Sequence, residues 1–78
     1  MAVGVTYIAT ATELEQTIVQ LRDIPLAVRG PTAEYALQRI AEMQVVGVLP
    51  AEQADRLRLV AEQQLAEVKQ WQRARARV

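Results

Sequence analysis

Proline and glycine are placed so that they separate regular segments instead of interrupting them. All three prolines and two of the three glycines lie at Pro25, at Gly30-Pro31 and between Gly47 and Pro50. These residues favour turns and helix ends, because proline lacks an amide donor and glycine tolerates backbone conformations that other residues avoid. The chain therefore divides into an opening segment and three segments that can be helical.

The fold class predicted from these segments is mainly α. We expect a first, shorter helix over about residues 13–23, followed by an antiparallel helical hairpin formed by residues 32–46 and 50–76. The hairpin follows from the short connection at residues 47–50, since short connections usually make neighbouring helices antiparallel. All of residues 1–78 would form a single small helical domain.

Three stretches outside these helices have their own interpretations. Residues 2–9 are rich in β-branched and aromatic types and could form a short N-terminal strand. Residues 25–29 could be a short strand or an extended connector, because periodicity cannot decide over so few residues. Residues 72–78 are expected to be a frayed basic tail.

Local signals set the expected helix boundaries. Thr12 and Glu15 match a capping box, in which a hydroxyl and a carboxylate satisfy free backbone amides of the first turn. The step into Pro25 ends the first helix, since the residue before proline is pushed out of the α region. Gly47 is expected to end the second helix, and Pro50 suits the first position of the third.

The third predicted helix is too long for the second to cover. At 1.5 Å per residue, residues 32–46 would span about 22 Å and residues 50–76 about 40 Å. The hairpin would then cover only the first half of the third helix. An apolar seam near heptad spacing runs into the uncovered half, and it supplies the predicted interface residues, which are Leu57, Ala61, Leu65, Val68 and Trp71.

Two interpretations of this seam remain open. In one, the first helix folds back over the seam, and Trp71 belongs to the core of a three-helix bundle. In the other, the seam is an oligomerisation or docking surface. The second interpretation is supported by the length of 78 residues, since a core of that size leaves stability marginal without further burial.

The side chains that perform most enzyme chemistry are missing from this chain. It contains no histidine, cysteine or serine, so nucleophilic and general-base catalysis lack their usual groups. A zinc site of the usual type has no ligands, and the isolated glycines form no phosphate-binding loop. We therefore expect no enzyme, no catalytic residues, no metal and no cofactor. Tyr7 and Tyr35 are interpreted as packing residues with a polar tip.

Charge is balanced, with nine basic and nine acidic residues and a formal net charge of zero. No overall field therefore favours nucleic acid or an anionic membrane. Lys69, Arg73 and Arg77 share one face and are the candidate phosphate contacts. The plainer interpretation is that cations near a helix C-terminus stabilise the helix dipole.

Two pairs of opposite charges fit helical spacing. Arg39 and Glu42 are three positions apart, and Glu52 and Arg56 are four apart, so each pair would meet on a helix surface. Exposed pairs of this kind contribute only a few tenths of a kcal/mol. We interpret them as features of solvated faces.

Nothing in the sequence predicts a membrane segment. The longest apolar run, residues 45–51, is far shorter than the roughly 20 residues that span a bilayer. Residues 1–9 lack the basic flank and hydrophobic stretch of a signal peptide. We expect a soluble, cytoplasmic protein.

Residues 29–36, with the sequence RGPTAEYA, follow a strand-like segment, a helix and a turn, and this outline resembles a ribbon-helix-helix DNA-binding domain. In that family the second helix often begins after a glycine with a hydroxyl cap, and the strand reads the major groove. The resemblance covers about half the chain and implies a dimeric DNA-binding regulator or an antitoxin. The strand-like segment offers only Thr6 and Tyr7 as polar side chains, so no DNA-contact residues are assigned.

Residues 47–52, with the sequence GVLPAE, resemble the connection in short helical-hairpin oligomerisation modules. Together with the seam, they favour a non-enzymatic protein–protein interaction module, such as an assembly, adaptor or inhibitor protein. It would self-associate through its long C-terminal helix, as a homodimer or with a further protein partner. The alternative is the dimeric DNA-binding regulator or antitoxin.

Overall fold

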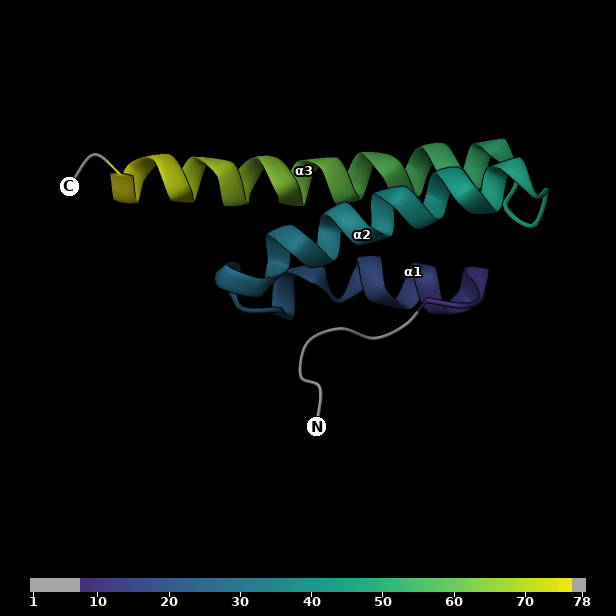
Figure 1. Cartoon of the computed structure of the whole chain (residues 1–78), viewed down its shortest axis with the longest axis horizontal. Helices are drawn as coiled ribbons and strands as arrows, with labels where there is room; N and C mark the ends of the chain where they lie inside the picture. The colour runs from purple at the N-terminus through teal and green to yellow at the C-terminus, as the bar shows by residue number, and fades with distance from the viewer. Residues whose placement is uncertain (1–7, 77–78) are drawn as a thin grey trace.

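The computed structural model describes residues 8–76 and is mainly α, as the sequence predicts. Helix α1 (Ala11–Val19) leads through the single 3₁₀ turn η1 (Leu21–Asp23) into α2 (Leu26–Val45), and α3 (Ala51–Ala76) completes the described chain. Helices α2 and α3 lie side by side and antiparallel, while α1 packs against both and runs in the same direction as α3 (Figure 1). The predicted helical hairpin is confirmed.

The predicted N-terminal strand is not found where the structure describes it. Residues 8 and 9 are neither helical nor extended in a ladder, and no strand occurs in residues 8–76. The rest of the predicted segment, residues 2–7, lies outside the described residues. The backbone of Ile8 is instead held by side chains of α2: its amide donates to Tyr35 Oη at 3.2 Å, and its carbonyl oxygen accepts from Arg39 Nε at 2.9 Å.

Helix α1 begins two residues earlier than predicted. Its capping box is formed by Thr10 and Glu13 instead of Thr12 and Glu15: the Glu13 amide donates to Thr10 Oγ1 at 3.1 Å, and Glu13 Oε1 accepts from the Thr10 amide at 3.1 Å. The same carboxylate also accepts from the Ala9 amide at 3.0 Å. Both pairs fit the motif, and the earlier pair satisfies one more free amide.

The predicted start of the second helix was wrong. Helix α2 begins at Leu26 and not at Thr32, so residues 26–29 are helical instead of a strand or connector, and Pro31 lies inside the second turn. The Pro25 carbonyl oxygen accepts from the amides of Val28 and Arg29, both at 2.9 Å, which fixes the first turn.

Gly30 explains how the helix runs through a proline. A residue before proline is disfavoured in the α region partly by its Cβ, which glycine lacks. A Cβ at position 30 would also lie 3.3 Å from Val68 Cγ1 on α3. Gly30 therefore permits both the helical backbone at Pro31 and a close approach of α2 to α3.

The turn between α2 and α3 is the one that the sequence predicts. Gly47 has a φ of 82°, which suits glycine, and it closes a Schellman motif. The Val48 amide donates to the Met43 carbonyl oxygen at 3.0 Å, and the Gly47 amide donates to that of Gln44 at 3.1 Å. Pro50 stands directly before α3, and its carbonyl oxygen accepts from the Ala54 amide at 2.9 Å.

One apolar core joins the three helices. Small side chains line the contact between α2 and α3 and allow the helix axes to approach closely. The buried apolar residues are Ile8, Leu14, Ile18, Leu21, Ala33, Ala36, Ile40, Met43, Leu49, Ala54, Leu57, Ala61 and Val68. Within residues 8–76 no helix is both long and apolar enough to cross a membrane.

Candidate functional site

The structure places the predicted interface residues on the side of α3 that faces the rest of the chain. Because α2 starts at Leu26, it covers more of α3 than predicted, and Val68 is only 2% exposed. Leu57 and Ala61 are also buried, and Leu65 packs against the core. A contact between subunits through the three buried side chains would require opening the hairpin.

Trp71 is half-buried and lies in the last two turns of α3. The C-terminal end of α3 extends past the start of α2 (Figure 1). The guanidinium carbon of Arg75 lies over the indole ring, 4.9 Å from its centroid. Exposed cation–π contacts of this type contribute about 0.5–1 kcal/mol. Trp71 is therefore partly covered within its own helix.

The candidate phosphate contacts lie on the same terminal turns. Lys69 and Arg73 are exposed on α3, and Arg77 lies outside the described residues. Residues 72–76, part of the predicted frayed tail, are helical and exposed, and their fraying stays a prediction.

Exposed aliphatic side chains gather in two places instead. The first group is the hairpin tip, which we define as Val45, Val46 and Val48. The second, which we call the apolar flank, consists of Val19 on α1 and Val60 on α3, which line one groove and are 67% and 38% exposed, together with Leu59, which precedes Val60 on α3, does not line the groove and is 57% exposed. The flank differs from the tip because it borders a groove.

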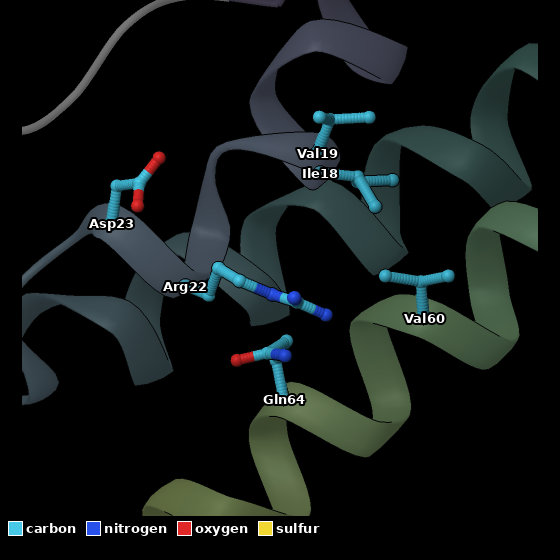
Figure 2. A pocket seen from close by; sticks show the side chains of 6 residues that line it. All are labelled: Ile18, Val19, Arg22, Asp23, Val60 and Gln64. Carbon is cyan, nitrogen blue, oxygen red and sulfur yellow. The ribbon is translucent and has the colours of Figure 1, made fainter.

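The groove lies between α1 with η1 on one side and α3 on the other. It has a volume of about 300 Å³, and it is lined by Ile18, Val19, Arg22, Asp23, Val60 and Gln64. Figure 2 shows Ile18 and Val19 facing Val60 across the groove, and the Arg22 side chain extending toward Gln64. The groove is therefore apolar at the α1 end and polar toward η1.

Hydrogen bonds within the chain satisfy the polar floor of the groove. Gln64 is 7% exposed, and its Oε1 accepts from Arg29 Nη1 at 3.4 Å. Arg29 also donates from Nη2 to the Arg22 carbonyl oxygen at 2.9 Å and from Nε to the Ile24 carbonyl oxygen at 3.1 Å. In residues 8–76 no buried side-chain nitrogen or oxygen lacks a partner. The floor thus needs no polar ligand to satisfy it.

The surface charges of residues 8–76 are only partly paired. Arg39 and Glu42 form the predicted ion pair at 2.6 Å. On α3 the observed pair is Arg58 with Asp55 at 3.1 Å. The predicted partner of Glu52, Arg56, forms no ion pair with any described residue.

Sequence reasoning missed the groove because it depends on how α1 and α3 are placed together. One signal was available: Val19 lies outside the stripe of Leu14, Ile18 and Leu21 that forms the buried face. Single exposed apolar residues are common, so Val19 becomes informative only once Val60 is placed across the groove from it.

The chemistry that the groove supports is apolar contact. Across residues 8–76 no group of three or more acidic, histidine or cysteine side chains is placed to hold a metal ion. Comparison with protein-family models, curated proteins and solved structures found no match to this chain.

Proposed function

We propose that this chain is a non-enzymatic protein–protein interaction module that self-associates through its long C-terminal helix, α3. The observation that carries the proposal is the apolar flank, which exposes large aliphatic side chains beside a groove on α3. Each aliphatic side chain that passes from water into a contact contributes about 1.5–3 kcal/mol when it is fully buried. Covering the flank would therefore favour association.

The size and shape of the chain also favour association with a partner. Its radius of gyration is 13.1 Å, while a compact chain of its length would have about 11.5 Å. An elongated small domain buries less of its surface, so its stability gains from a partner. A second copy is the partner that is always present. Location in the cytoplasm stays a prediction of the sequence.

The test is size-exclusion chromatography coupled to light scattering over a concentration series. We expect the mass to rise from 8.7 kDa toward twice that value. The variant Leu59→Gln should stay monomeric, because it places an amide on the proposed contact. Val45→Gln is the matched control: Val45 is 86% exposed at the hairpin tip, and its replacement should leave the association unchanged.

Two outcomes would contradict the proposal. A wild-type mass that stays monomeric at every concentration would exclude self-association, and loss of association in Val45→Gln alone would assign it to the hairpin tip. The same series with duplex DNA tests the alternative function. A complex that weakens steeply with salt would support the DNA-binding regulator, with Lys69 and Arg73 as its phosphate contacts.

A further inference from the structure

We infer that the outer face of α3 packs antiparallel against the same face of a second copy of this chain, so that the basic end of each helix lies against the acidic half of the other. This inference rests on the proposed function, since it specifies the surface and the direction of self-association. The argument for a second copy as the partner is charge complementarity.

The outer face is a stripe of exposed residues on α3. In Figure 1, α1 and α2 both lie on one side of α3, so its other side is open to a partner. Alternating steps of three and four positions keep one side of a helix, as in a coiled coil. On α3 such steps connect eight exposed residues, which are Glu52, Asp55, Leu59, Glu62, Ala66, Lys69, Arg73 and Ala76.

The charges of the outer face are separated along the helix. Three acidic residues precede Ala66 on the stripe, and two basic residues follow it. The whole chain has the same asymmetry: residues 1–68 contain five basic and nine acidic residues, a net charge of −4, and residues 69–78 contain four basic and no acidic residues, a net charge of +4. A chain with a net charge of zero is therefore complementary to its own copy.

Stabilisation of the helix dipole explains only part of this order. Acidic residues near the start of a helix and basic residues near its end are favourable, but the effect falls off within the first and last turn. Glu62 lies about three turns after the start of α3, and Lys69 lies about two turns before its end. Their separation is thus available to select a partner.

The order of charges selects the antiparallel direction. A two-fold axis perpendicular to α3, between Glu62 and Ala66, places position 55 of one copy opposite position 73 of the other. Asp55 then meets Arg73 twice, because each copy supplies both members of the pair. The same axis places Leu59 opposite Lys69, whose aliphatic stem can cover a leucine. A parallel pair would instead place like charges together.

The charges that this contact needs are available. No ion pair within residues 8–76 involves Glu62, Lys69 or Arg73. Asp55 pairs with Arg58 at 3.1 Å, but its side chain is 72% exposed, so its carboxylate can accept further hydrogen bonds. Arg58 also donates to Gln44 Oε1 on α2 at 2.7 Å and is therefore held toward α2.

Salt and charge reversal test the surface. The association constant should fall at least tenfold between about 0.01 M and 1 M salt, because the Debye length shortens from about 30 Å to about 3 Å. Asp55→Arg and Arg73→Asp should each weaken self-association about tenfold, since the two-fold axis makes each reversal act twice. The double variant Asp55→Arg/Arg73→Asp should restore most of the wild-type association constant.

Arg22→Asp is the matched control for Arg73→Asp. It changes the net charge by the same amount at another exposed arginine, which lines the groove and lies outside the outer face. We expect it to leave the association constant nearly unchanged. Circular dichroism checks that each variant keeps its helices.

Cross-linking tests the direction without removing a charge. Ala51 and Ala76 are exposed at opposite ends of α3, and the chain has no cysteine, so introduced thiols report only on these positions. A mixture of Ala51→Cys and Ala76→Cys chains should form dimers with a short bismaleimide cross-linker. Ala76→Cys alone should form few, because the antiparallel arrangement keeps its two copies far apart.

The outcomes separate this inference from the proposed function. If the wild type stays monomeric, both fail, and binding of duplex DNA by that monomer would assign the basic end to nucleic acid. If the wild type dimerises but salt and both single reversals have no effect, the outer face is wrong and self-association stands. Weakening by Arg22→Asp alone would assign the contact to the groove. Equal cross-linking of Ala76→Cys alone and of the mixture would overturn the antiparallel direction.

Discussion

Pro31→Ala tests the feature in which structure and sequence prediction differ most, the start of α2. In the structure Pro31 lies in the second turn of α2, where its missing amide leaves the Ala27 carbonyl oxygen without its usual helical donor. If the helix began at Thr32, as predicted from the sequence, Pro31 would lie before the first turn and would remove no helical bond. The two possibilities give stability changes of opposite sign.

The magnitude follows from two opposing contributions. Proline in a helix interior is about 3 kcal/mol less favourable than alanine, and the figure is smaller near a helix end. Replacing proline also frees the unfolded chain, which removes about 0.4–1 kcal/mol of stability. We therefore expect Pro31→Ala to stabilise the fold by about 1–2 kcal/mol. For a domain of 60–100 residues this corresponds to a melting temperature about 5–15 °C higher.

The assay is thermal and urea unfolding followed by circular dichroism, at one low concentration so that association does not shift the midpoint. Pro25→Ala is the matched control, because Pro25 precedes α2 and removes no bond inside it. We expect Pro25→Ala to lower the free energy of unfolding by up to about 1 kcal/mol. A Pro31→Ala variant that is equal to or less stable than the wild type would refute the reasoning, and would place the helix start at Thr32.

Three further substitutions test other parts of the fold by the same unfolding assays. Val68→Ala should lower the free energy of unfolding by about 2 kcal/mol, because it empties a buried contact with α2. Val46→Ala at the exposed tip should change it by less than about 0.5 kcal/mol. Equal effects would mean that α2 does not cover this part of α3. Gly47→Ala should lower the free energy of unfolding by about 1–2 kcal/mol through backbone strain alone, since a Cβ there meets nothing within 4 Å. An unchanged unfolding midpoint would exclude the positive φ at this residue. Thr10→Ala should lower the free energy of unfolding by about 1 kcal/mol, because it removes the cap of α1, and Thr12→Ala should lower it much less. A larger effect of Thr12→Ala would instead support the capping box predicted from the sequence.

The sequence predicted those elements whose ends are determined by residues a few positions away. The hairpin, its turn at Gly47 and the extent of α3 depend on helix-ending and helix-starting residues that act within a few positions. The start of α2 depends also on packing against α3. Gly30-Pro31 is a strong stop signal in isolation, but the packing of Gly30 against Val68 and the first turn at Pro25 favour a continuous helix. Such a balance is set by contacts distant in sequence.

The candidate site was less predictable than the fold for the same reason. The seam on α3 was recognised, but its residues, such as Leu57 and Ala61, are buried within the chain once α2 is extended. The groove combines α1, η1 and α3, and its main signals, Val19 and Val60, have meaning only when those elements are placed together. Periodicity indicates which face of a helix is apolar, and the neighbouring helices decide whether that face remains available.

The short turn at residues 46–50 also determines how quickly parts of the chain find each other. Met43 and Leu49, on either side of Gly47, are buried close together, and joining them requires closing only a small loop. Chains dominated by such local contacts fold in microseconds to milliseconds. The Ile8 amide donates to Tyr35 Oη, 27 positions away, so closing the loop between these residues carries a larger entropy cost. The hairpin should thus be complete before Ile8 reaches α2, and docking of Ile8 should be the last step of folding.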